Sequence, residues 1–142
     1  MKQTVTAGVM VPHPPIILPN IGRGEEKKIQ DIADACQHAA DAIVASQPDT
    51  ILIVSPHAPS YFDYIQISDG PSGHGSMAQF RDPMDTFEIP YDRELIRETA
   101  RICEETGIPA GTLGQQDGSL DHGTMVPLYF LEEALKRAPG ST

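Results

Sequence analysis

Two short apolar runs, each followed at once by a proline and then a histidine, constrain this chain most strongly. Residues 4–11, Thr-Val-Thr-Ala-Gly-Val-Met-Val, and residues 50–55, Thr-Ile-Leu-Ile-Val-Ser, have the β-branched, largely apolar composition of buried strands. Proline fixes φ and lacks a backbone donor, so the proline after each run ends the strand. Each strand therefore leads into a stiff loop that carries a histidine, His13 or His57.

Helical patterns lie between and after these two runs. Apolar side chains recur there at steps of three and four, which predicts amphipathic helices. The predicted helices are residues 25–46, 92–106 and 124–136, and further strands are predicted at 63–68 and 109–113. Residues 69–90, rich in glycine and proline, are predicted to be irregular. Pro127 is acceptable in the first turn of the last helix, because an N–H there has no intrahelical partner.

Strands that alternate with helices predict a single α/β domain over residues 1–142, with a central, largely parallel sheet covered by helices on both faces. A chain of 142 residues fits one such domain with a hydrophobic core. In sheets of this kind, ligands bind outside the carboxyl ends of the strands. His13 and His57 follow the first two strands, so we expect both at the same edge of the sheet.

Composition narrows the choice of partner and compartment. The net charge of −10 argues against binding to nucleic acid or to an anionic membrane surface. No run approaches the roughly 18 consecutive apolar residues of a membrane span, and residues 1–6 lack the apolar core of a secretory signal. Cys36 and Cys103 both fall in helical patterns, which favours reduced core residues over a disulfide or a metal pair. We therefore expect a cytoplasmic protein.

The histidines differ in their settings. A ligand must be held in place before a metal arrives, and the proline-stiffened loops of His13 and His57 provide this. The alternative, two loop histidines bonded to backbone carbonyls, accounts less well for two matched settings. His38 lies opposite the apolar stripe of its helix and is expected in solvent. His74 falls in a glycine-rich segment that we interpret as a flexible surface loop, although it could close over a substrate.

His122 precedes the last predicted helix, in Ser-Leu-Asp-His-Gly-Thr. Asp121 or Thr124 could cap that helix, which is a structural explanation for part of the motif. Capping does not explain the histidine. A helix N-terminus disfavours an imidazolium, so His122 is expected to be neutral and able to accept a proton. From the residues alone, the motif fits a structural and a chemical role equally well.

Three motifs together resemble the class III extradiol ring-cleaving dioxygenases. They are Val-Pro-His-Pro-Pro around His13, Ser-Pro-His-Ala-Pro around His57, and Leu-Asp-His-Gly-Thr-Met-Val-Pro-Leu around His122. The resemblance is closest to the LigB-like catalytic subunits and to relatives grouped with the Memo proteins. Each motif is weak alone, but the three follow the family order along nearly the whole chain.

This resemblance implies a centre of two histidines and one carboxylate that usually holds Fe(II). His13 and His57 would be the metal ligands, and His122 would be the catalytic acid and base beside the metal. A catecholic substrate would bind the iron through both oxygens, a neutral base would remove the second hydroxyl proton, and dioxygen would take a remaining open position. The implied partners are therefore a small aromatic substrate and dioxygen.

The chain departs from the family in its carboxylate ligand, which in LigB-like enzymes is a glutamate well downstream of the Asp-His-Gly segment. We therefore expect an N-terminal fragment of a longer protein, with this ligand beyond residue 142, or a site completed by another residue or chain. Asp63, Glu88 and Asp121 are candidates within the chain, and the sequence does not choose among them. A site of two histidines could also hold Zn(II).

Three functions fit these observations. The first is Fe(II)-dependent extradiol cleavage of a catechol-type ring, the second is a metal-dependent hydrolase, and the third is a catalytically inactive Memo-like protein that binds a metal or a partner. For the enzymes, substrate contacts are expected in residues 69–90, with Arg81 pairing with a substrate carboxylate and His74 as a second contact. If the domain is truncated, apolar surface would be exposed and a homo-oligomer is expected.

Overall fold

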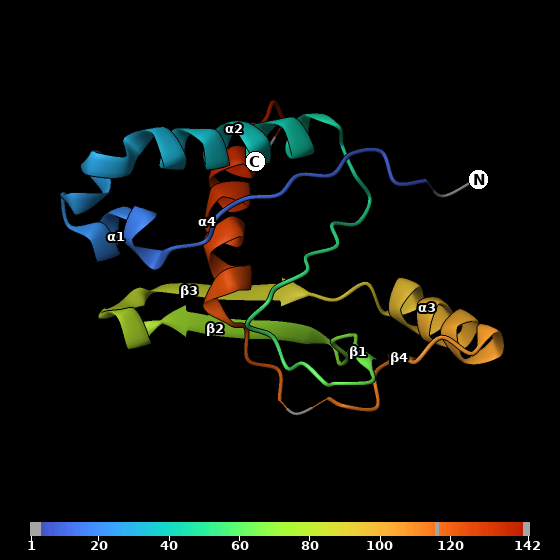
Figure 1. Cartoon of the computed structure of the whole chain (residues 1–142). Coiled ribbons are helices and arrows are strands. Elements are labelled where there is room, and N and C mark those ends of the chain that lie inside the picture. Colours follow the sequence, from blue (N-terminus) through green and yellow to red (C-terminus); the bar gives the residue numbers. More distant parts are fainter. Residues whose placement is uncertain (1–3, 116, 141–142) are drawn as a thin grey trace.

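The computed structural model describes residues 4–115 and 117–140. Residues 1–3 of the segment 1–6, which we interpreted as lacking a secretory signal, therefore lie outside the described residues. Helices make up most of the regular structure, and the strands are few and mostly short (Figure 1). In chain order the elements are η1 (Pro15–Ile17), α1 (Pro19–Gly22), η2 (Glu25–Ile29), α2 (Gln30–Ala45), β1 (Ile65–Gln66), β2 (Ser72–Met77), η3 (Ala78–Phe80), β3 (Asp82–Pro90), α3 (Arg93–Thr106), β4 (Ala110–Gly111) and α4 (His122–Arg137).

The three predicted long helices are confirmed. The helix predicted at 25–46 is divided into η2 and α2, and α3 begins after Asp92, whose side chain accepts a hydrogen bond from the backbone N–H of Leu95 at 2.9 Å. Gly107 ends α3 in the left-handed conformation (φ 72°), which glycine adopts without steric cost. The predictions for the cysteines and for His38 also agree with the structure: both thiols are free and buried, and His38 is exposed.

The helix α4 begins two residues earlier than predicted, because Asp121 rather than Thr124 caps it. The carboxylate of Asp121 accepts a hydrogen bond from the backbone N–H of Thr124 at 3.2 Å. As a consequence, Pro127 lies inside the helix and not in its first turn, which corrects our expectation. Pro127 has no N–H to donate to the carbonyl of Gly123, four residues earlier.

A mixture of helices and strands is confirmed, but the predicted central parallel sheet is not found among the described residues. β1 pairs with β4 in parallel, with Ile65 opposite Ala110. The strands predicted at 63–68 and 109–113 are therefore present, but only two residues of each are in strand conformation. β2 and β3 form a separate antiparallel pair. Within residues 4–115 and 117–140, the strands therefore form two separate two-stranded pairs.

The strands predicted at 4–11 and 50–55 do not form. Both segments cross the molecule without regular structure (Figure 1), and many of their apolar side chains face solvent, including Val5 at 94% exposure and Leu52 at 80%. An apolar pattern favours burial, but a strand also needs a neighbouring backbone with which to exchange hydrogen bonds. Neither segment meets such a neighbour within the described part of the chain.

Residues 69–90 contain the longest strands, so the prediction of an irregular segment was wrong. The glycines of β2 do not serve as turns there. A Cβ on Gly73 would lie 2.4 Å from the Tyr91 hydroxyl, and one on Gly75 would lie 2.7 Å from the Met125 sulfur. Glycine is therefore needed for close packing within a strand, a use that composition alone does not distinguish from a loop.

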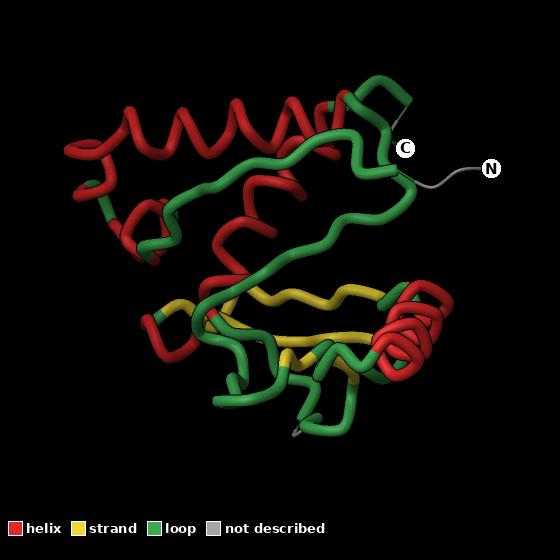
Figure 2. Tube along the Cα trace, turned by 45° about the vertical axis from the view of Figure 1, so that its right-hand side comes forward, coloured by secondary structure: helices red, strands yellow, loops and turns green. Residues whose placement is uncertain are grey.

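The core lies where α4 packs against α2 and reaches the β2–β3 hairpin. Figure 2 shows α4 standing between these two elements. Met125 and Val126, at 1% and 0% exposure, are among its buried side chains, and the side-chain amide of Gln37 on α2 donates to the Phe130 carbonyl at 3.1 Å. This packing fixes α4, whose first residue is His122.

In the described part of the chain, no helix is long and apolar enough to cross a membrane.

Candidate metal centre

Three histidines from distant parts of the sequence meet at one place. His13, His57 and His122 each offer one ring nitrogen, and these three atoms lie within 4.8 Å of one another. The Nε2 atoms of His13 and His57 are 3.0 Å apart. The ring centroids of His57 and His122 are separated by 4.1 Å, and those of His13 and His122 by 5.8 Å. We expected His13 and His57 at the same edge of a sheet. Their ring nitrogens do meet, but among the described residues no strand precedes either histidine, so the expected sheet edge is not found.

The position of His13 depends on the residues that follow it. Pro14 and Pro15 restrict the backbone and lead into η1. Ile17 and Leu18, at 1% and 0% exposure, then anchor this turn in the core. A buried anchor within five residues limits how far the His13 loop can move.

His57 is held from its amino-terminal side. Its backbone N–H donates to the Ser55 hydroxyl at 3.2 Å, and that hydroxyl donates to the Asp121 carboxylate at 2.5 Å. His57 is itself exposed, so its ring is open to solvent and to a bound molecule.

His122 is the first residue of α4, directly after the capping Asp121. Its ring also meets the ring of Phe80 edge to face, with 5.3 Å between the centroids. Burial lowers the pKa of His122, the charges of His57 and His13 lower it further, and the carboxylate of Asp121 opposes the shift. The expected neutral imidazole is thus supported, with burial as the main cause.

The donor set fits a transition metal. Neutral imidazole is a common ligand of iron, zinc and copper. Two nitrogens bound at about 2.1 Å to one ion are at most about 4.2 Å apart, so the 3.0 Å between the Nε2 atoms is compatible with shared coordination. Among the described residues, no carboxylate belongs to this cluster, so Asp63, Glu88 and Asp121 do not complete it.

Comparison with known families finds a match over most of the chain. The family described as the catalytic LigB subunit of aromatic ring-opening dioxygenase matches residues 7–139, nearly the whole described chain. This chain belongs to the LigB family. The match assigns the chain to this family but to no subgroup within it, and membership of a Memo-related group stays a prediction.

A relative of this LigB-family chain is the protein CA_C1420 of Clostridium acetobutylicum, whose name describes no activity. The two are 37% identical over 134 residues, which cover 89% of this chain and 29% of the relative. The chain thus spans less than a third of the curated relative it matches. No solved structure matches the chain.

The structure does not bring His74 and Arg81 into the histidine cluster of this LigB-family chain. His74 lies in β2, paired with Glu88 on β3, and its backbone exchanges hydrogen bonds with Gly118 and Leu120. It is therefore part of a strand and not of a flexible loop. Arg81 is exposed and follows η3 in the left-handed conformation (φ 67°), next to Phe80. A role for either residue in substrate binding stays a prediction.

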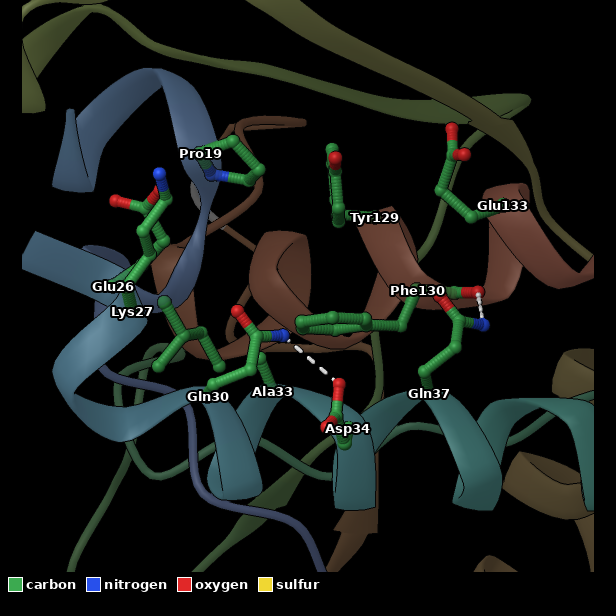
Figure 3. A pocket seen from close by; sticks show the side chains of 11 residues that line it. Pro19, Glu26, Lys27, Gln30, Ala33, Asp34, Gln37, Tyr129, Phe130 and Glu133 are labelled. Carbon is green, nitrogen blue, oxygen red and sulfur yellow. Dashed lines mark hydrogen bonds between the residues drawn. The ribbon is translucent and has the colours of Figure 1, made fainter. Parts of the chain in front are cut away.

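A cavity of about 260 Å³ opens elsewhere, between α2 and α4 (Figure 3). Its lining includes Gln30, Asp34 and Phe130, and the amide of Gln30 donates to Asp34 at 2.9 Å. None of the histidines lines it. The cavity is therefore separate from the candidate metal centre.

Sequence reasoning did not assign roles to Ser55 and Gly123, although both stand in the motifs that carry the family resemblance. Ser55 precedes His57 by two residues, and Gly123 follows His122. The sequence feature that could have indicated a role was a small residue within two positions of each of these histidines. Their significance depends on a contact across the chain that no local pattern reveals.

Proposed function

We propose that this chain supplies the metal-binding and proton-transferring histidines of an extradiol ring-cleaving dioxygenase that acts on a catechol-type substrate. The convergence of His13, His57 and His122 within 4.8 Å, in a chain of the LigB family, carries this proposal. Because the chain spans only 29% of its relative, the complete activity is proposed for a longer protein or assembly.

In this proposal, His13 and His57 are the metal ligands and Fe(II) is the metal. Their Nε2 atoms face each other at 3.0 Å, and the buried turn after His13 and the hydrogen-bonded Ser55 before His57 hold them in place. When bound, Fe(II) would supply the redox chemistry with dioxygen that opening an aromatic ring requires. A carboxylate from outside the described residues would complete the ligand set.

His122 acts as the acid and base in this proposal. Its lowered pKa leaves an imidazole nitrogen free to take the proton of a substrate hydroxyl at neutral pH. The same nitrogen can return the proton when the ring opens. Packing against Phe80 holds the half-buried imidazole in place.

Phe80 and its neighbour Arg81 are the proposed substrate contacts on this side of the cluster. The edge-to-face packing of Phe80 on His122 places an aromatic ring beside the reactive histidine, where a catechol ring would also lie. Arg81, exposed at the end of η3, could pair with a carboxylate on such a substrate. His74 is proposed as a second contact, farther along the hairpin.

One observation favours a second function. The cluster consists of three histidines without a described carboxylate, and three imidazoles are also the ligand set of catalytic zinc sites that activate water. A Zn(II)-dependent hydrolase would use all three histidines as ligands. The two proposals therefore differ in the role of His122.

Metal loading of the purified chain tests the proposal. After anaerobic loading with Fe(II) or Zn(II), we expect close to one ion per chain in the wild type, and loss of at least about tenfold in affinity for His13→Ala and for His57→Ala. His38→Ala is the matched control, because His38 is exposed on α2 and should leave loading unchanged. Equal loading of all variants would contradict the site.

The role of His122 is tested by the variant His122→Ala in the longer protein or assembly for which the activity is proposed, loaded with Fe(II) anaerobically and then exposed to dioxygen and a catechol. As an acid and base, His122 can be removed without loss of Fe(II), while formation of the yellow ring-opened product from a catechol stops. As a third ligand, its removal weakens metal binding as strongly as removal of His57. The second result, together with Zn(II)-dependent hydrolysis, would favour the hydrolase.

A further inference from the structure

The Ser55 hydroxyl connects two of the three histidine-bearing segments. It donates to the Oδ1 atom of Asp121 at 2.5 Å and accepts from the backbone N–H of His57 at 3.2 Å. The first of these bonds joins residues that are 66 positions apart in the sequence. Through one hydroxyl group, the loop of His57 is therefore attached to the residue that precedes His122.

Asp121 is itself firmly placed. Its Oδ1 atom also accepts from the backbone N–H of Thr124 at 3.2 Å, and its Oδ2 atom accepts from the Thr124 hydroxyl at 3.1 Å. These bonds cap α4, a helix that the core holds through buried side chains such as Val126. The Ser55 hydroxyl is thus bonded to a rigid part of the structure.

Gly123 provides independent evidence for this close approach. A Cβ at this position would lie 2.4 Å from the Ser55 hydroxyl oxygen and 3.1 Å from Cδ2 of His57. The backbone of Gly123 has no left-handed conformation that would require glycine. The absence of a side chain is therefore used to admit the Ser55–His57 segment.

The rest of this segment has few other contacts: the Thr50 hydroxyl donates to Asp92, and the half-buried Ile53 packs against the core. Residues 50–55 belong to no strand, and Leu52 and Val54 are 80% and 87% exposed. A backbone without ladder partners does not by itself fix the position of His57 relative to α4. The bond from Ser55 to Asp121 joins this segment to the start of α4 two residues before His57.

We infer that Ser55 and Asp121 are positioning residues that set the separation of His57 and His122 at the metal centre, with Gly123 providing the space. This inference rests on the proposed function for its consequence, because a fixed separation of the two rings matters most when one binds a metal and the other moves a proton. Groups that orient metal ligands in this way typically contribute about 10- to 100-fold to metal affinity.

The variant Ser55→Ala tests the inference while leaving Asp121 in place to cap α4. We expect the dissociation constant for Co(II), measured by competition with a chromophoric chelator, to rise about tenfold or more, and the visible spectrum of the bound ion to change. Ser55→Thr keeps the hydroxyl and should restore both. Ser60→Ala, an exposed serine in the same loop, is the matched control and should resemble the wild type.

A readout without metal separates this inference from the proposed function. In the metal-free protein, NMR cross-relaxation between ring protons of His57 and His122 should be strong at a centroid separation of 4.1 Å. It should weaken in Ser55→Ala and persist in Ser55→Thr and Ser60→Ala. A wild type that binds no metal but shows this NMR pattern would refute only the metal centre. Unchanged cross-relaxation in Ser55→Ala would overturn the positioning role, whatever the metal result.

Discussion

Asp82 and Asp85 place two carboxyl oxygens without another partner inside the protein, where β3 begins. Asp82 is 4% exposed, and the Oδ2 atoms of both residues are buried and lack a hydrogen-bond partner among the other described groups. Burial raises the pKa of Asp85 to about 6, and the neighbouring Asp82 contributes to the shift. Burial would also raise the pKa of Asp82, but hydrogen bonds from Asp85 and from backbone N–H groups outweigh it and lower the value. A proton shared between the two carboxyl groups accounts for both pKa shifts, the raised value of Asp85 and the lowered value of Asp82.

The variant Asp85→Asn should therefore change how stability depends on pH. The folded pKa of Asp85 lies above its ordinary value of 3.8, so its proton stabilises the fold at low pH and this stabilisation is lost as the pH rises through about 6. Asparagine donates to Asp82 at every pH. We expect the variant to be about 1–3 kcal/mol more stable than the wild type at pH 8 and equally stable near pH 4. Urea unfolding at both pH values measures this, and a variant less stable at pH 8 would contradict a shared proton.

Among the helices, α4 has two functions, because it forms much of the core and also presents His122. Leu128 is 7% exposed, whereas Leu135 on the same helix is 51% exposed. The two leucines therefore permit a matched comparison. Core packing can hold His122 in place through α4 only if the buried side chains of this helix contribute most of its stability.

Replacement of Leu128 by alanine should lower the free energy of unfolding by about 2–5 kcal/mol, because it leaves a cavity between α4 and its neighbours. Leu135→Ala removes the same atoms from a half-exposed position and should lower it by less than about 1 kcal/mol. Denaturant unfolding of both variants provides the measurement. Equal effects would show that α4 does not pack as the structure describes.

At the scale of the whole molecule, the two unpaired segments leave a large apolar surface. Val5, Met10, Leu52 and Val54 are each at least 80% exposed. Single exposed apolar residues are ordinary, but several on two segments without ladder partners favour association. These exposed residues are where we expect the self-association that the sequence predicts.

We predict that the isolated chain self-associates and that the double variant Leu52→Lys/Val54→Lys weakens this association. Burial of each side chain would contribute about 1.5–3 kcal/mol, so the dissociation constant should rise about tenfold or more. Sedimentation velocity over a range of concentrations is the measurement. Ser60→Lys/Asp63→Asn changes the net charge equally but leaves the apolar surface, and an equal effect of this control would contradict the prediction.

The sequence by itself determined the three long helices, two candidate caps for the last of them, Asp121 and Thr124, and the identity of the histidines. These follow from local rules, since helical periodicity and capping involve residues at most four positions apart. The proline-flanked histidines could also be proposed as ligands from the sequence, because stiff loops and imidazoles are properties of short segments.

Only the tertiary structure decided how these parts meet. The pairing of β2 with β3, the missing partners of residues 4–11 and 50–55, and the bond from Ser55 to Asp121 all depend on backbone that is distant in sequence. An apolar strand pattern does not specify its neighbour, and a glycine does not reveal whether it turns the chain or admits another side chain. The histidine cluster was predictable in its members, but its geometry is set by contacts across the fold.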